Sequence, residues 1–365
     1  MKPKIILLII SFFIVSISRS QVVLLDSITN SPIAAVSVFD SNGHLISISD
    51  KNGTIYLNEE KLSDLDYFSF QHLSYRSKEI SLKNILATER LVKLSPSTFV
   101  IDEIEINNKP KEWLILKGYF RALETFDGKN KYFSDGIVKF YIPLTQKKAK
   151  IKHSIEAYRV LGNKEAIKAY KEAMGPFIEP PRIPNISSTP IHLGLSKEYE
   201  IKSQETSANI YKQQVKVGEI KIDPNGKAQT YIDFVLPDSM IKKKLFRIEG
   251  IRTSQVRIET YDVSRLSDIT LQNLQSWYSH TIGSIKRKNN LGYFHYEILS
   301  EFYVMERSFL TNQEVETKKS IFNKNAYLDE KSNYTQEFWK DLERYGIPSI
   351  APAVVKQFDK ELIEF

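Results

Sequence analysis

Apolar and polar residues alternate with a period of two along much of the chain, and this pattern predicts a protein built mainly from β-strands. Between residues 22 and 95 the apolar runs are short, and polar turns separate them. Two of these turns contain Asn-Gly, at Asn42-Gly43 and Asn52-Gly53, and both residue types tolerate the positive φ of tight hairpins. A turn about every ten residues is typical of a β-sandwich. We therefore predict a small sandwich of about seven strands over 22–95.

Longer alternating segments fill residues 113–365, after a linker over 96–112 that holds one short apolar strand at 101–106. Apolar residues fall at helical spacing after Asn163, between 266 and 281, and in the C-terminal tail,. These patterns predict an α+β domain in which helices pack on the concave side of a large curved antiparallel sheet. Together with the sandwich, this gives a fold class of mainly β, with α+β character in the second domain. The expected strands are 118–126, 132–142, 151–161, 210–222, 228–236, 245–251, 256–261 and 294–304.

The N-terminus has the pattern of a secretory signal peptide over residues 1–20. Lys2 and Lys4 precede an apolar run over 5–17, and Ser18 and Ser20 are small residues that favour cleavage before Gln21,. An uncleaved N-terminal anchor is the alternative. We expect an exported protein, periplasmic or associated with the outer membrane, with no transmembrane helix after cleavage.

The composition argues against nucleic-acid binding and excludes cysteine chemistry. The chain has a formal net charge of +7, and removal of the leader with Lys2, Lys4 and Arg19 leaves +4, which is too weak a bias to indicate a nucleic-acid partner,. The sequence contains no cysteine. This excludes disulfides, thiolate metal ligands and a cysteine nucleophile.

The first predicted domain has an order of motifs that resembles a known family. These motifs are P-I-A-A-V-S-V at 32–38, S-D-K-N-G at 49–53 and F-S-F-Q-H-L-S-Y at 68–75. They resemble the carboxypeptidase regulatory-like domain, a transthyretin-like sandwich that also occurs at the N-terminus of TonB-dependent outer-membrane receptors, where a strand similar to 101–106 often follows. The resemblance implies a docking or spacing role without catalytic residues. The remainder resembles uncharacterised C-terminal regions of exported bacterial proteins, which brings no activity.

One spacing is typical of a zinc site. His153 and Glu156 form a His-x-x-Glu pair as in metallocarboxypeptidases, with His280 as a distant third ligand,. In a strand, however, these two side chains point to opposite faces. We therefore favour a surface strand, and we assign no catalytic, cofactor-binding or metal-binding residue.

Other candidates have simpler explanations. Asp40 and Asp50 fit turn chemistry better than a calcium loop, whose alternating oxygen ligands and closing Glu are missing,. The paired carboxylates Asp64 and Asp66, and Glu103 and Glu105, fit solvated strand or turn residues. The aromatic residues Tyr278, Tyr293 and Trp339 fit packing better than stacking on a sugar,. The basic runs at 147–150 and 285–288 fit solvated turns better than contact with anionic lipid,.

The sequence thus predicts an exported, non-catalytic accessory or binding protein of the cell envelope. Its partner would be an envelope protein, a glycan or a lipid, and no cofactor is expected. Two alternatives stay open at this point. One is a hydrolase whose active site, zinc-dependent in one version of this hypothesis, lies in the second domain. The other is a small outer-membrane β-barrel, which the aromatic C-terminal residue Phe365 and the strand lengths favour,, but which the helical pattern of the tail disfavours.

Overall fold

A computed structural model describes residues 20–57, 66–101, 110–145, 149–175, 180–223 and 226–365. The predicted leader, apart from Ser20, and nearly all of the predicted strand at 101–106 lie outside the described residues. Within the described part, no helix is long and apolar enough to span a membrane.

Two small sheets at the start of the chain form the predicted sandwich. One has the order β4-β1-β7 and the other the order β3-β2-β5-β6. Apolar residues from both sheets, such as Leu24, Val38 and Phe70, share one buried cluster, so the two sheets pack face to face. The prediction of a seven-stranded sandwich is confirmed. Its elements are β1 (Ser20–Asp26), β2 (Ser37–Phe39), β3 (Leu45–Ile48), β4 (Thr54–Leu57), β5 (Tyr67–His72), β6 (Tyr75–Ser81), α2 (Leu82–Ala87) and β7 (Leu91–Leu94).

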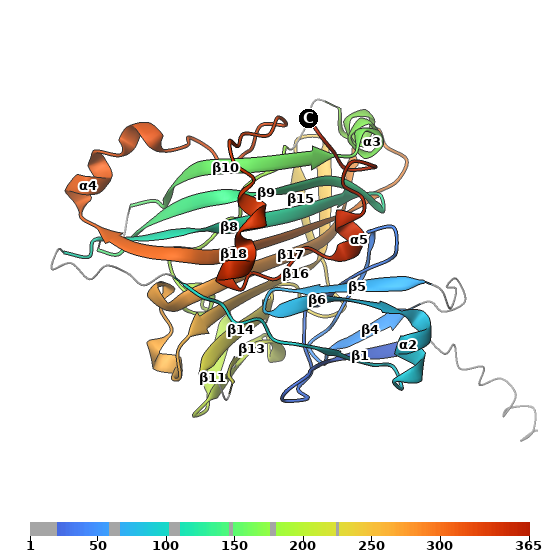
Figure 1. Cartoon of the computed structure of the whole chain (residues 1–365), viewed down its shortest axis with the longest axis horizontal. Helices are drawn as coiled ribbons and strands as arrows, with labels where there is room; N and C mark the ends of the chain where they lie inside the picture. The colour runs from blue at the N-terminus through green and yellow to red at the C-terminus, as the bar shows by residue number, and fades with distance from the viewer. Residues whose placement is uncertain (1–19, 58–65, 102–109, 146–148, 176–179, 224–225) are drawn as a thin grey trace, which may run out of the picture.

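The rest of the chain forms one 12-stranded antiparallel sheet, shown in Figure 1. Its strand order is β11-β12-β13-β14-β16-β17-β18-β8-β9-β10-β19, and β15 pairs with β16. The late strand β18 therefore lies beside the early strand β8. The strands are β8 (Trp113–Phe126), β9 (Lys129–Pro143), β10 (Lys152–Gly162), β11 (Tyr199–Ser203), β12 (Ser207–Lys212), β13 (Val215–Ile222), β14 (Lys227–Asp233), β15 (Ile241–Leu245), β16 (Ile248–Asp262), β17 (Leu274–Arg287), β18 (Phe294–Leu310) and β19 (Ile363–Glu364).

The large sheet is strongly curved. Val138 and Phe140 of β9 belong to the same buried cluster as Ala208 and Ile210 of β12, although six strands lie between β9 and β12 in the sheet. The sheet must curl to bring these residues together, so its concave face encloses the main core. The loop over 180–198 fills this space, with Ile183 among its buried residues.

The convex face is covered by the C-terminal segment and the sandwich. In Figure 1 the C-terminal segment, in red, crosses in front of the long strands, and the sandwich lies at the lower right. Tyr119 of β8 and Tyr303 of β18 share a cluster with Val354 of the C-terminal segment and Phe39 of the sandwich. The sequence predicts that helices pack on the concave side, but the helical turns of the tail lie on the convex side. Among the described α-helices, only α3 (Lys164–Met174) reaches the concave core, through Ile167.

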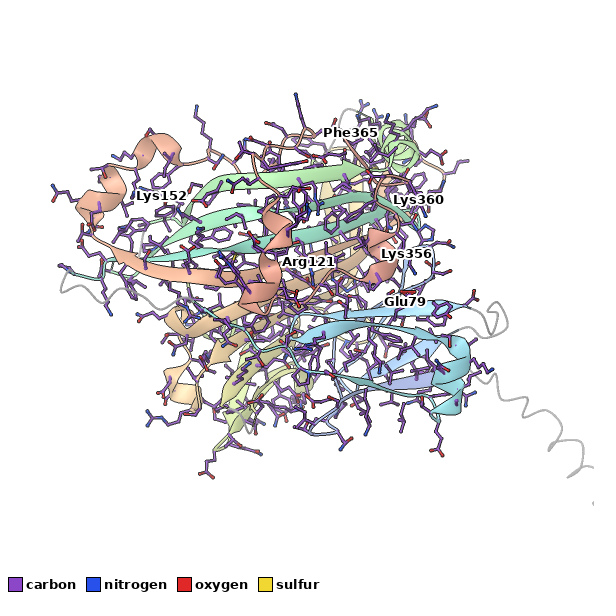
Figure 2. All side chains as sticks on the ribbon, in the orientation of Figure 1. Glu79, Arg121, Lys152, Lys356, Lys360 and Phe365 are labelled. Carbon is purple, nitrogen blue, oxygen red and sulfur yellow. The ribbon has the colours of Figure 1, made fainter. Side chains whose placement is uncertain are left out.

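Polar contacts join the sandwich to the C-terminal segment. The Ala351 N–H donates to Gln71 Oε1 at 2.7 Å, and the Ala353 N–H donates to Ser69 Oγ at 3.1 Å. Lys356 Nζ lies 2.7 Å from Glu79 Oε1, and Figure 2 labels both residues where the C-terminal segment meets the sandwich. The sandwich is thus fastened to the segment that covers the sheet.

The helix expected over 266–281 is wrong. Two short turns, η3 (Leu266–Asp268) and η4 (Leu271–Asn273), precede β17. Both faces of β17 are covered, because Trp277 belongs to the concave core and Tyr278 to the convex one. A strand buried on both faces loses the simple alternation of apolar and polar residues, so chance helical spacing dominated the pattern.

The tail contains only short helical turns. They are α4 (Asn312–Glu316), η5 (Lys319–Ile321), η6 (Phe338–Lys340), η7 (Leu342–Tyr345) and α5 (Pro352–Val355). The first expected stripe ends at Gly346, which adopts φ 68°, and Pro348 follows. The second stripe begins at Pro352 and is interrupted by Asp359, which adopts φ 63°. Proline disfavours helical conformation in the residue before it.

Helix α3 begins where the sequence predicts. Asn163 Oδ1 accepts from the N–H groups of Glu165 and Ala166 at 3.0 and 3.1 Å. We expect Asn163→Ala to lower the free energy of unfolding by about 1 kcal/mol, because these N–H groups lose their cap. Urea denaturation measures the change, with the exposed Lys168→Ala as the control. Equal stability of the Asn163 variant and the native protein would contradict the capping role.

Candidate functional site

The concave face contains a cavity of about 360 Å³. It lies at the end of the sheet where β16 and β18 begin and β8 and β17 end, under α3 and the loop that follows it. We call it the arginine cavity. Its lining residues are Glu124, Thr125, Phe126, Lys131, Tyr170, Arg182, Ile183, Pro184, Asn185, Arg252, Gln255, Arg257, Trp277, Ser279, Thr281, Ile285, Tyr296, Ile298 and Ser300.

Two arginines of β16 dominate the charge of this cavity. Arg252 Nη1 donates to Gln255 Oε1 at 2.6 Å. Within the part of the chain that the structure describes, the buried Nε atoms of Arg252 and Arg257 have no hydrogen-bond partner. Burial, with the nearby charge of Arg252, holds the pKa of Arg257 below its usual value. Guanidinium groups keep their charge in proteins, so these donors favour an anion.

The other charged residues of the lining do not cancel this charge. Glu124 is the one carboxylate among the described lining residues, and Lys131 Nζ lies 3.1 Å from its Oε2. Lys131 also sits 4.2 Å from the centroid of the Tyr170 ring. With Arg182, Arg252 and Arg257 added, the lining carries a formal excess of three positive charges.

Hydroxyl and aromatic groups complete the lining. Ser279 and Thr281 of β17 and Ser300 of β18 lie at alternate positions and face the cavity together with Trp277. Trp277 is buried, while Arg252 and Arg257 are half-buried. A cavity with convergent hydrogen-bond donors and an aromatic wall is typical of a site for a small ligand. This arrangement suits an anionic group attached to a ring or short apolar chain.

A buried carboxyl lies next to the cavity. Glu259 follows Arg257 on the same face of β16, and it is 1% exposed. Its Oε2 accepts from the Ile191 N–H at 2.7 Å and from the Tyr261 hydroxyl. Burial raises the pKa of Glu259 to about 7, although both hydrogen bonds and the charge of Arg257 act in the opposite direction. Glu259 therefore gains or loses a proton near neutral pH.

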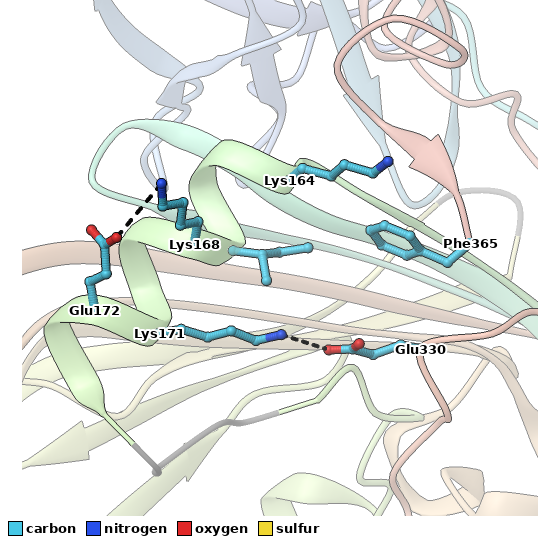
Figure 3. A pocket seen from close by; sticks show the side chains of 7 residues that line it. Lys164, Lys168, Lys171, Glu172, Glu330 and Phe365 are labelled. Atoms are coloured by element: carbon cyan, nitrogen blue, oxygen red, sulfur yellow. Dashed lines mark ion pairs between the residues drawn. The ribbon is translucent and has the colours of Figure 1, made fainter.

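A second hollow, of about 450 Å³, lies between α3 and the C-terminal residue Phe365 (Figure 3). Four of its five charged side chains pair with one another. Lys171 Nζ lies 3.8 Å from Glu330 Oε1, and Lys168 Nζ lies 4.0 Å from Glu172 Oε1. Because these groups are exposed and paired with one another, this hollow is the weaker candidate.

The three residues of the zinc hypothesis do not come together. His153 Nε2 contacts the Asn325 carbonyl at 2.8 Å. Glu156 instead pairs with Lys139 and Lys117. His280 is buried on the convex face, where its Nε2 lies 2.9 Å from Glu297 Oε2. Among the described residues, no group of three or more His, Cys, Asp or Glu residues has the arrangement of a metal site.

The two turn carboxylates have the contacts expected of turn chemistry. Asp40 Oδ1 accepts from the Asn42 and His44 N–H groups, both at 2.9 Å. Asp50 Oδ1 accepts from the Asn52 and Thr54 N–H groups at 2.8 and 2.9 Å.

The remaining candidates are scattered. Tyr278 is buried, Trp339 stacks on the guanidinium of Arg159 at 3.9 Å from the ring centroid, and Tyr293 is 38% exposed on the turn between β17 and β18. Residues 285–288 belong to the same region as Tyr293. Asp64, Glu103, Glu105, Lys147 and Lys148 lie outside the described residues.

A charged network on the convex face fixes the C-terminal segment to the sheet. Arg121, 3% exposed, forms an ion pair with Glu301, 1% exposed. Its Nη1 donates to the Pro348 carbonyl at 2.7 Å and its Nη2 to the Tyr303 hydroxyl at 3.0 Å. Arg121 is labelled beneath the C-terminal segment in Figure 2. These groups are enclosed by protein, so we interpret the network as structural.

No family model matches the chain, and no curated protein matches it. The resemblance of residues 22–95 to the carboxypeptidase regulatory-like domain therefore stays a prediction. Sequence reasoning missed the arginine cavity because Gln255, Arg257 and Glu259 look like the solvent-facing side of a strand. These three polar residues on one face of the strand were the only available signal, and the same pattern is expected for an ordinary exposed face.

Proposed function

We propose that the protein is an exported, non-catalytic binding protein of the cell envelope that holds a small anionic ligand in the arginine cavity. The observation that carries this proposal is the pair of buried Nε donors of Arg252 and Arg257, which have no partner among the described residues. A buried donor without a partner costs free energy, and the guanidinium groups of both arginines belong to residues that line the cavity, so a bound anion would supply acceptors where the protein supplies too few. The ligand class is a phosphate, sulfate or carboxylate group attached to a ring or short chain, as in fragments of acidic glycans or lipids.

The sandwich has a spacing role in this proposal. It is fastened to the C-terminal segment through Gln71, Ser69 and Glu79, and that segment covers the convex face. The cavity opens on the opposite, concave face. Contacts of the sandwich with an envelope protein would therefore leave the cavity accessible. Export rests on the apolar leader expected over residues 1–20.

Calorimetric titration with 1-naphthyl phosphate tests the proposal, because this probe joins an anion to an aromatic ring. We expect saturable binding, and binding at least about tenfold weaker for uncharged 1-naphthol. Arg257→Gln should weaken binding of the phosphate by about tenfold or more, since a hydrogen bond to a charged group is worth roughly 1.5–3 kcal/mol.

Arg265→Gln is the matched control. Arg265 is exposed and pairs with Asp268 at 2.9 Å, and it does not belong to the cavity lining. Its substitution should leave the affinity for naphthyl phosphate unchanged. The proposal is wrong if naphthyl phosphate does not bind, or if Arg257→Gln binds it as tightly as the native protein does.

A further inference from the structure

Two hairpin turns lie side by side at the end of the sheet nearest the arginine cavity. Leu245 pairs with Ile248 across the first turn, which joins β15 to β16. The second turn joins β17 to β18 over residues 288–293. Ile248 pairs with Arg287, and the Lys288 N–H donates to the Arg247 carbonyl at 2.8 Å. The two turns therefore form one continuous surface, which we call the hairpin tips (residues 240–247 and 286–293).

Large apolar side chains project from the hairpin tips. Leu245 is 68% exposed, Phe246 is 80% exposed, and Leu291 is fully exposed. Phe246 also adopts φ 53°, a conformation that favours Gly, Asn or Asp in a two-residue turn. Turn formation therefore does not explain a phenylalanine at this position.

Basic side chains lie on the same two turns and on the strands that lead into them. The hairpin tips contain Lys242, Lys243, Lys244, Arg247, Lys286, Arg287 and Lys288. Glu249, next to the tips on β16, accepts from the Tyr293 hydroxyl, and its Oε2 lies 4.0 Å from Lys286 Nζ. The hairpin tips thus contain seven cationic residues and no carboxylate of their own.

The backbone of the tips is held in place from behind. Ile248, Ile285 and Phe294 pack with Phe126 and with Met174 of α3 in one cluster. Asn290 Nδ2 donates to the Ala173 carbonyl at 3.0 Å. The apolar side chains are thus presented on a fixed support, and docking would lose little conformational entropy.

We propose that the hairpin tips dock the protein on a bilayer that contains anionic phospholipids. Leu245, Phe246 and Leu291 would enter the boundary between head groups and acyl chains, while the lysines and arginines contact lipid phosphates. Apolar side chains within a basic surround are what binding to such an interface requires. An acidic protein partner would use the same charges, but it would not need three exposed apolar side chains on two adjacent hairpins.

This inference goes beyond the proposed function, because it concerns where the protein is held and not what it binds in the cavity. Ile285 and Arg252 line the arginine cavity and lie only a few residues from the tips along β17 and β16. A docked protein would therefore hold the cavity close to the membrane surface.

Cosedimentation with vesicles tests the docking, using the chain from Gln21 onward. Vesicles of phosphatidylcholine alone are compared with vesicles of phosphatidylcholine and phosphatidylglycerol in equal parts. We expect binding to the anionic vesicles that weakens as salt is added. Leu245→Ser/Phe246→Ser/Leu291→Ser and, separately, Lys243→Gln/Lys244→Gln/Lys288→Gln should each lower the partition coefficient at least about tenfold.

The control is Leu193→Ser, because Leu193 is 65% exposed on the loop after α3, outside the hairpin tips. It should leave vesicle binding unchanged. Both triple variants should keep the affinity for naphthyl phosphate, because none of their residues lines the arginine cavity. Docking and ligand binding can therefore fail independently.

Tryptophan fluorescence of the Phe246→Trp variant reports insertion of the tips into the bilayer. We expect its emission maximum to shift to shorter wavelength when anionic vesicles are added. The proposal is overturned if the native chain does not bind anionic vesicles, or if the apolar variant binds them as well as the native chain does. Binding lost only in the charge variant would indicate an acidic protein or another polyanion as the partner, and would also overturn it.

Discussion

Replacement of Arg121 by methionine should lower the free energy of unfolding by about 3–5 kcal/mol, the range measured when one partner of a buried ion pair is removed. Glu301 is 1% exposed, and Arg121 is its cationic partner within the described chain. Without the guanidinium, the carboxylate has Tyr303 and a long contact from Gln71 Nε2, at 3.4 Å. The Pro348 carbonyl loses its donor at the same time.

Guanidinium denaturation followed by circular dichroism measures this loss. The matched control is the double variant Arg121→Met/Glu301→Leu, which removes both charges and fills the space with apolar atoms. Because desolvation of both ions is then avoided, we expect the double variant to recover most of the lost stability. A single variant within about 1 kcal/mol of the native protein, or a double variant no better than the single one, would contradict a stabilising buried pair.

Alternation in the sequence was enough to locate most of the strands. The segments expected at 118–126 and 132–142 are β8 and β9, each longer than expected by a few residues, and the segment expected at 151–161 is β10, shifted by one residue. The Asn-Gly turns give Gly43 and Gly53 the positive φ that their residue type permits. These features are local, so a single sequence contains the information that determines them.

The pairing of distant strands was not predictable in this way. β18 lies beside β8, and no local pattern indicates that residues nearly two hundred positions apart are neighbours. The sequence also does not show that both faces of the sheet are covered. Arg121 and Glu301 look like solvent-facing residues of an alternating strand, yet the C-terminal segment and the sandwich bury them.

The candidate site was hidden for the same reason. In β16, Arg257 and Glu259 alternate with Val256 and Ile258, which is the pattern of a strand with one wet face. The curvature of the sheet turns that face inward and encloses Arg257 in a cavity. The hairpin tips differ, because the apolar and basic residues at 240–247 and 286–293 are visible in the sequence, whereas their adjacency is not.

Glu259 should make the stability of the protein fall as the pH rises from about 4.5 to about 7. Burial raises the pKa of this carboxyl from its ordinary value of 4.5 to about 7 in the folded protein. Between these values the folded state holds a proton that the unfolded state has released, so folding is favoured at the acidic end. The contribution is fully present below about pH 4.5, is lost by about pH 7, and amounts to about 3 kcal/mol.

Glu259→Gln tests this effect, because glutamine keeps an oxygen for the Ile191 N–H and the Tyr261 hydroxyl but cannot ionise. The stabilities of the variant and the native protein should be similar near pH 4.5, and the variant should be more stable by up to about 3 kcal/mol above pH 7. Tyr261→Phe removes a donor that lowers the pKa of Glu259, so it should extend the pH-dependent range upward. Urea denaturation at a series of pH values measures both. A difference between Glu259→Gln and the native protein that stays constant from pH 5 to pH 8 would show that Glu259 does not titrate in this range, because only a pKa that differs between the folded and unfolded states gives a pH-dependent difference.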